Sequence, residues 1–311
     1  MAANSRRPIL FPAQNWYGSS ARASCAALRR LGHDVWEIDD QVFIPQWRHL
    51  LMKVGRRLAI ARMVQEYNDE ILRQVHAWKP DFMLAFKGQY VLPQILDRLR
   101  HAGIRLYNYY PDTSAFAHGP WLAQTLPLYD CVFTTKPFWE RDVSSRLKLA
   151  HCQYIPHGYD PDVHFPMSLQ ERDVADFRHE AVFVGSYIPH KEMVIHGLLE
   201  IQPDLDLAIW GNGWEKCGSS LLKRCLKGYA LNATAYSRAL QASAICLGIM
   251  SGRVPGSSQG DEMTTRSFQI PACGAFMLHE RTAELARYFD EGKEVACFDT
   301  PEELSSKICH Y

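Results

Sequence analysis

The sequence lacks a surplus of either charge, because its 34 lysines and arginines are matched by 34 aspartates and glutamates. With no overall positive field, we expect neither nucleic acid nor an anionic membrane as a partner, and any phosphate must be bound locally. The sequence also lacks the run of about 18 apolar residues that a transmembrane helix needs. The N-terminus leads only into a short apolar segment, residues 8–11, so we expect no signal peptide either.

Paired cysteines are missing as well. The nine cysteines form no Cys-x-x-Cys pair and no cysteine–histidine cluster with the spacing of a zinc site. Such cysteines are typical of a reducing compartment, so we expect a cytoplasmic protein without a metal site. The length of 311 residues is long for one core and suits two domains.

What the sequence contains instead is an alternation of short apolar segments with helical patterns. In the first half, the apolar segments predict strands over residues 8–11, 33–38, 81–86, 104–110 and 131–135. Strands that alternate with helices predict an α/β fold with a parallel sheet. Ligands of such sheets bind at the carboxyl ends of the strands.

Three residues of the first half follow predicted strand ends. Gly18 serves either a turn or a close approach of the backbone to a ligand. Asp112 is our candidate general base for an acceptor hydroxyl, and His118 is the second candidate. The alternatives are a turn residue for Asp112 and a surface-loop histidine for His118.

Residues 154–166 are dense in proline, glycine and aspartate and have no helical periodicity. We place the domain boundary there, with the first domain at 1–160 and the second at 161–311. In the second domain, Gly185 and Ser186 end a predicted strand and Lys191 begins the next helix. A further strand at 205–210 leads into Gly211 and Gly213, which are a weak nucleotide-binding signal by themselves.

The most informative segment is 261–274, Asp-Glu-Met-Thr-Thr-Arg-Ser-Phe-Gln-Ile-Pro-Ala-Cys-Gly. Its acidic and hydroxyl residues, Thr265 among them, predict the start of a helix that Gly274 ends, before a strand at 275–278. Arg266 then stands one turn into the helix, where it can contact phosphate oxygens. Asp261 and Gln269 are eight residues apart, so both side chains would face one edge of a cleft. The alternative is an ordinary helix start before a buried strand.

This segment resembles the signature of CgeB-type spore-maturation proteins and related GT-B glycosyltransferases. In the wider retaining families the equivalent segment is a Glu-x7-Glu motif that runs into Ala-Cys-Gly, and its two acids hold the donor sugar and the ribose hydroxyls. The resemblance implies these roles for Asp261 and Gln269. Gln269 departs from the pattern, and because it is uncharged its hydrogen bonds to ribose should be weaker than those of a carboxylate.

The resemblance covers roughly residues 105–300 and implies a GT-B fold, in which two Rossmann-like domains face a central cleft. It implies a diphosphate at the turn of residues 185–191 and a nucleotide base near Tyr229. His157 stands in a stretch similar to the Ile-Pro-Asn-Gly-Val-Asp connection of such enzymes, so it either lines the cleft or is a plain linker residue. The expected donor site comprises Gly185, Ser186, Lys191, Gly211, Gly213, Tyr229, Asp261, Thr265, Arg266 and Gln269.

We therefore expect a glycosyltransferase of the hexosyltransferase type. It would move a sugar from a UDP- or dTDP-sugar to an unknown acceptor, which is a small molecule, a glycan or a protein, without a cofactor or metal ion. Two alternatives stay open: a GT-B nucleotide-sugar epimerase, and a catalytically weak protein that binds sugar nucleotides or a partner. Proteins of this kind normally continue with helices that return to the first domain, so we expect either that the second domain is truncated at residue 311 or that the crossover is missing by nature.

Overall fold

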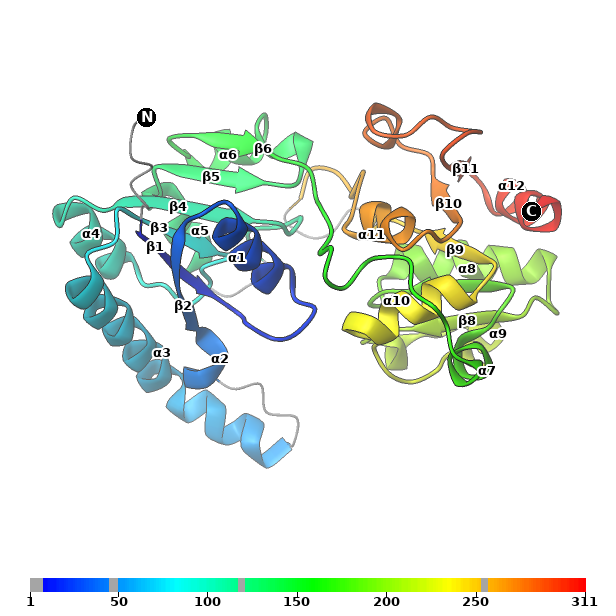
Figure 1. The fold of residues 1–311 in the computed structure, drawn as a ribbon, viewed down its shortest axis with the longest axis horizontal. Helices are drawn as coiled ribbons and strands as arrows, with labels where there is room; N and C mark the ends of the chain where they lie inside the picture. The colour runs from blue at the N-terminus through cyan, green and yellow to red at the C-terminus, as the bar shows by residue number, and fades with distance from the viewer. Residues whose placement is uncertain (1–7, 45–49, 117–120, 253–256) are drawn as a thin grey trace. The chain divides into compact units, whose positions relative to one another are not determined.

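The computed structural model describes residues 8–44, 50–116, 121–252 and 257–311 of the chain. These residues form two compact units (Figure 1). The first contains the described residues up to Pro156 together with Ser257 and Ser258, and the second contains the other described residues from His157 onward. The boundary expected at residue 160 lies in the same stretch rich in proline and glycine. Each unit contains a parallel sheet connected by helices, so the α/β fold with two Rossmann-like domains is confirmed.

The first unit contains a six-stranded sheet in the order β2-β1-β3-β4-β5-β6, in which every neighbouring pair is parallel. Its strands are β1 (Pro8–Ala13), β2 (Asp34–Asp39), β3 (Phe82–Phe86), β4 (Arg105–Tyr110), β5 (Cys131–Thr134) and β6 (Cys152–Tyr154). Its helices are α1 (Ser20–Arg30), α2 (Asp40–Phe43), α3 (Leu50–Trp78), α4 (Pro93–His101), α5 (Leu122–Thr125), η1 (Leu126–Leu128), η2 (Pro137–Trp139) and α6 (Val143–Leu147).

The five strands predicted for this half are all present. Leu10, Met83 and Leu106 stand on three neighbouring strands and are fully buried, because both faces of a parallel sheet are covered. β6 was not predicted. Its three residues are only partly buried or exposed, so no apolar run marks it in the sequence.

The second unit contains a five-stranded parallel sheet in the order β11-β10-β9-β7-β8. Its strands are β7 (Ala181–Val184), β8 (Leu207–Trp210), β9 (Ile245–Gly248), β10 (Met277–Glu280) and β11 (Ala296–Phe298). Its helices are α7 (Glu171–Phe177), α8 (Pro189–Ile201), η3 (Trp214–Lys216), α9 (Ser220–Lys223), α10 (Ala233–Ala242), α11 (Arg266–Ala272), η4 (Leu285–Arg287) and α12 (Pro301–His310). On β7, Phe183 packs into one apolar cluster and Val182 and Val184 into another, so this sheet is also buried on both faces.

Helix α12 was not predicted, although its sequence carries ordinary helix-start signals. The Thr300 hydroxyl accepts a hydrogen bond from the Glu303 backbone at 3.2 Å, and Pro301 occupies the first turn. The helix packs on α8, where the Gln202 side chain donates to the Ser305 carbonyl at 3.0 Å.

All nine cysteines are free thiols, and six of them are buried. Five of the buried thiols belong to the second unit: Cys217, Cys225, Cys246, Cys273 and Cys297. Cys309, on α12, is exposed. Within the described ranges, no helix combines the length and the apolar composition needed to cross a membrane.

Candidate functional site

Several predicted donor residues of the second unit lie near the carboxyl ends of its strands. Gly185 follows β7 and Gly211 follows β8, and the two backbones are in close contact: a Cβ on Gly211 would lie 2.0 Å from the Gly185 carbonyl oxygen. The Trp214 indole donates to the same oxygen at 2.9 Å. The Gly211 amide in turn donates to the Tyr229 carbonyl at 3.0 Å, while the Tyr229 side chain is 56% exposed. These turns therefore form one surface, with an exposed aromatic ring beside it.

Gly213 has a left-handed backbone, with φ at 85°. A Cβ there would approach the Tyr187 Cβ to 3.3 Å, which is tighter than ordinary contact. Both the conformation and the space therefore favour glycine.

Two cations flank the ring of Phe183 in this unit. Lys191, in the first turn of α8, is buried, and its ammonium donates to the Ser186 carbonyl at 3.0 Å. Its nitrogen lies 5.7 Å from the centre of the Phe183 ring, and the guanidinium carbon of Arg266 lies 5.1 Å from the same centre. Arg266 donates from Nη2 to the Ile249 carbonyl at 2.9 Å. Lys191 and Arg266, which the sequence analysis assigned to one phosphate site, therefore lie close together in the structure.

The cation pair is electrostatically unfavourable without an anion. Burial, together with the neighbouring charge of Arg266, lowers the pKa of Lys191 to about 7. Burial also lowers the pKa of Arg266. Arg266 Nε is shielded from solvent and has no hydrogen-bond partner among the described residues. Two adjacent cations, one with an unsatisfied donor, make a site that an anion would complete.

Asp261 and Glu280 supply the negative charge near this pair. Each of them raises the pKa of Lys191 and of Arg266, but less than burial lowers it. The Asp261 backbone amide donates to the Ser251 carbonyl at 2.7 Å, which holds residue 261 in the loop after β9.

The predicted helix start at Asp261 is wrong. α11 begins at Arg266 and has seven residues, with Thr265 as its N-cap. Met263 is buried, and the Ser267 hydroxyl accepts from the Thr264 backbone at 3.2 Å, so residues 261–265 lead to the helix without joining it. Arg266 is accordingly the first helical residue, and the spacing of Asp261 and Gln269 does not measure two helical turns.

Sequence reasoning missed an ion pair next to Lys191. His190 Nε2 lies 2.7 Å from Glu280 Oε1, and this contact raises the pKa of His190. The other oxygen of Glu280 accepts from the Met250 backbone. The predicted strand ended at Leu278, whereas β10 continues to Glu280, so the place of Glu280 at a strand end was not visible. A strand prediction two residues longer would have found it.

A second histidine in this region, His279, was also missed. It is fully buried, with Nε2 2.8 Å from the Ser267 hydroxyl and Nδ1 2.6 Å from the Glu280 carbonyl. Burial lowers its pKa to about 4, so the ring is neutral and joins β10 to α11. A Cβ on Gly248 would stand 2.4 Å from the ring, which explains the small residue on β9.

The predicted residues of the first unit also lie at strand ends. Gly18 has φ at 90°, a backbone conformation that favours glycine. This conformation is compatible both with a turn and with a close approach of the backbone to a ligand. Asp112, after β4, forms an ion pair at 2.7 Å with Lys87, which follows β3. His118 lies outside the described residues. His157 is buried and stands at the start of the second unit. The catalytic and cleft roles of these four residues stay predictions.

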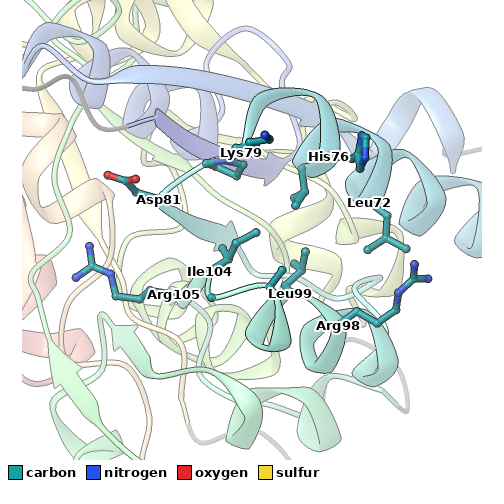
Figure 2. A pocket seen from close by; sticks show the side chains of 12 residues that line it. Leu72, His76, Lys79, Asp81, Arg98, Leu99, Ile104 and Arg105 are labelled. Atoms are coloured by element: carbon teal, nitrogen blue, oxygen red, sulfur yellow. The ribbon is translucent and has the colours of Figure 1, made fainter.

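A hollow of about 900 Å³ lies elsewhere in the first unit, at the amino ends of β3 and β4. Figure 2 shows its lining, in which His76, Arg98 and Arg105 surround the apolar Leu99 and Ile104. The hollow is at the opposite edge of the sheet from Asp112 and contains none of the predicted site residues.

Comparisons with known proteins bear on the fold and on the second unit. Residues 191–311 match a family model described as glycosyl transferase-like. A glycosyltransferase from Rickettsia africae ESF-5 aligns with 98% of this chain and 88% of its own, with a TM-score of 0.61 at 10% identity. A UDP-forming α,α-trehalose-phosphate synthase from Burkholderia xenovorans, in complex with glucose-6-phosphate, aligns with 97% of this chain and 91% of its own, with a TM-score of 0.60 at 10% identity.

A UDP-GlcNAc 2-epimerase from Methanocaldococcus jannaschii, in complex with UDP-GlcNAc and UDP, is similar as well. It aligns with 97% of this chain and 91% of its own, with a TM-score of 0.52 at 10% identity. No curated protein matches the sequence. The narrower CgeB-type resemblance stays a prediction. The chain therefore has the fold of GT-B glycosyltransferases and epimerases, and its residues 191–311 match a glycosyl transferase-like family.

Proposed function

We propose that the protein is a glycosyltransferase that takes a hexose from a nucleotide-diphosphate sugar, with UDP or dTDP as the nucleotide. The observation that carries this proposal is the pair formed by the buried Lys191, in the first turn of α8, and the half-buried Arg266, at the start of α11. A diphosphate is the anion that suits it, because two cations can share its charge.

The free hydrogen-bonding capacity of the pair supports a diphosphate. The Lys191 ammonium has three donors and uses one of them on the Ser186 carbonyl. Arg266 Nε has no partner among the described residues. Since these two side chains can neutralise the leaving diphosphate, we propose that the reaction needs no metal ion and no other cofactor. Donor turnover in excess EDTA tests this point.

Three further residues fit the rest of the donor. The exposed Tyr229 ring, beside the turn that follows β8, offers a stacking surface for the base. Gln269 is partly exposed on α11 and, within the described chain, its side chain makes no hydrogen bond, so it is available to ribose. Asp261, which lies close enough to interact with both cations, would accept from the sugar hydroxyls.

Calorimetry with uridine diphosphate tests the donor site. Arg266→Ala should weaken binding by about 1.5–3 kcal/mol, the range for a hydrogen bond to a charged group. Lys223→Met is a matched control, because Lys223 is an exposed lysine on α9 of the same unit, and it should bind like the wild type. Unchanged affinity for Arg266→Ala would remove the site.

An epimerase is the second candidate, because the M. jannaschii epimerase has the same fold. Product analysis separates the two activities. Incubation with a UDP-sugar panel and candidate acceptors yields UDP and a glycosylated acceptor from a transferase, whereas an epimerase yields the 2-epimer. Tight UDP binding with neither product would indicate a binding protein.

A further inference from the structure

Four neighbouring strands of the first unit each deliver a polar side chain to the same edge of the sheet. In the order of the sheet, β2, β1, β3 and β4 are followed directly or within two residues by Asp40, Gln14, Lys87 and Asp112. Parallel strands place their carboxyl ends at one edge, so these side chains form a row across it (Figure 1 labels the strands). Of these four residues, only Asp112 was predicted from the sequence as a catalytic residue.

The two carboxyl groups of the row have different partners. Lys87 Nζ lies 2.7 Å from Asp112 Oδ2, and both side chains are about one-third exposed. Asp40 is 7% exposed and receives a side-chain hydrogen bond from Gln14. Lys87 acts on Asp40 only through its charge. Asp112 is thus neutralised by a direct ion pair, whereas Asp40 has a neutral partner.

This difference makes Asp40 the better proton acceptor. Burial raises the pKa of Asp40 to about 7, and the adjacent charge of Asp39 raises it too, while Gln14 and Lys87 oppose the rise. The buried Tyr67 of α3 also faces these two aspartates. A general base is most effective when its pKa is near the working pH, and paired groups whose environments differ divide acid–base roles in this way.

A second observation, an acceptor without a donor next to Gln14 in the chain, favours a hydroxylated ligand. Asn15 follows Gln14 directly, and its side-chain oxygen is shielded from solvent without a hydrogen-bond partner among the described residues. A buried acceptor of this kind is costly unless a donor reaches it. The carboxylates of Asp40 and Asp112, with that of Asp39 next to Asp40, outnumber the single ammonium of Lys87, so a phosphorylated acceptor would be repelled.

We propose that Asp40 takes the proton of an uncharged, hydroxylated acceptor, and that the Lys87–Asp112 pair positions that acceptor. The proposal rests on the transferase function proposed above. As the acceptor oxygen bonds to the anomeric carbon, its proton passes to the Asp40 carboxylate, and the bond to the diphosphate breaks with its electron pair leaving on the phosphate oxygen. A base of this kind is needed for inversion, since in retention the departing phosphate takes the proton. The proposal therefore commits the reaction to inversion.

The test is the pH profile of UDP release from UDP-glucose and other UDP-hexoses, with water or glycerol as acceptor. For the wild type, kcat/KM should rise with pH through about 7 as Asp40 ionises. Asp40→Asn should lose about 10²–10⁴-fold in turnover together with this rise. Asp40→Glu, which keeps a carboxyl group, should recover part of the rate and a pH-dependent rise.

Two neighbouring variants serve as controls. Asp112→Asn should raise the KM for glycerol and keep the rise near pH 7, because it removes only the positioning pair. Asp39→Asn keeps a capping side chain on α2 and removes the charge beside Asp40, so the rise should move to lower pH. Thermal melting and UDP calorimetry must show that each variant folds and keeps its donor site.

Three results would overturn the inference. One is a wild-type rise that persists in Asp40→Asn, and another is a product with the anomeric configuration of the donor. The third is a turnover of Asp40→Asn that falls only in proportion to its loss of folding. UDP binding without turnover of any donor would instead refute the transferase function itself, and the inference with it.

Discussion

The carbonyl oxygen of Gly185 occupies the space that a side chain on Gly211 would need, since a Cβ there would lie only 2.0 Å away. The same oxygen accepts the Trp214 indole hydrogen bond at 2.9 Å. The turns after β7 and β8 are therefore held together by backbone contact, and the proposed donor site depends on two residues without side chains.

We expect Gly211→Ala to destabilise the second unit by about 1–3 kcal/mol or more, because the clash is with backbone and cannot be relieved by a rotamer change. Gly158→Ala is the control, since no atom lies within 4 Å of a Cβ at that position. Thermal unfolding measures both. Equal melting temperatures for the two variants would show that the two turns can move apart without destabilising the second unit.

The affinity for uridine diphosphate should fall as pH rises above about 7. The pKa of Lys191 is lowered to about 7, mainly by burial, so the free protein loses this charge above that pH. The diphosphate favours the protonated lysine, and its own last ionisation, near pH 6, is complete by then. Dissociation constants from calorimetry between pH 7 and 9 should rise by up to about tenfold per pH unit.

Two variants check that Lys191 causes this dependence. Lys191→Arg keeps a charge throughout the range and should bind with little pH dependence, whereas Lys191→Met should bind weakly at every pH. A slope in Lys191→Met as steep as in the wild type would assign the titration to another group.

Acid should destabilise the second unit through His279. Its pKa is lowered to about 4 from the usual 6.5, so between these values the unfolded state binds a proton that the folded state does not. Stability from this group is present above pH 6.5 and is lost as pH falls toward 4, by up to about 1.4 kcal/mol per pH unit.

Denaturant unfolding at pH 7, 6, 5 and 4.5 measures this loss. His279→Gln should be less stable at pH 7, because the contact with Ser267 is altered, yet it should lose less stability on acidification than the wild type. His151→Gln removes an exposed histidine and should follow the wild-type curve. If His279→Gln lost as much stability on acidification as the wild type, other groups would control acid unfolding.

Gln269→Glu should tighten uridine diphosphate binding, because a carboxylate accepts hydrogen bonds from ribose more strongly than an amide. Calorimetry with uridine diphosphate and with its 2′,3′-dideoxy analogue tests the cause. The gain should be confined to the nucleotide with ribose hydroxyls. Equal gains for both nucleotides would show that residue 269 does not contact ribose.

The sequence was sufficient to predict most of the strands and turns, because local sequence patterns determine them. A buried parallel strand is a continuous apolar run, as in Phe82–Phe86, and Gly18 and Gly213 mark turns by a backbone conformation that other residues avoid. The helix start at Asp261 could not be judged in this way. Residues 261–265 stay outside the helix, with the Asp261 amide bonded to the Ser251 carbonyl and the Thr264 amide bonded to the Ser267 hydroxyl, and the local sequence pattern does not reveal these contacts.

The charge relationships of the site were not predictable from local pattern. Lys87 and Asp112 are 25 positions apart in the chain, and Lys191 and Arg266, which lie beside the same ring of Phe183, are 75 positions apart. Asp40 was overlooked because nothing in the sequence distinguishes it from Asp39. Its burial, which depends on the packing of α2 and α3, gives it a different chemistry.

The buried cysteines of each unit can report how often that unit opens. Cys309 is exposed and should take up a thiol-reactive dye at once, whereas the buried Cys217, Cys225, Cys246, Cys273 and Cys297 react only when the second unit opens. Cys25 reports in the same way on the first unit. Mass spectrometry of pulse-labelled peptides would therefore time the opening of the two halves separately in a single sample. Added uridine diphosphate should slow the labelling of the five thiols and leave that of Cys25 unchanged.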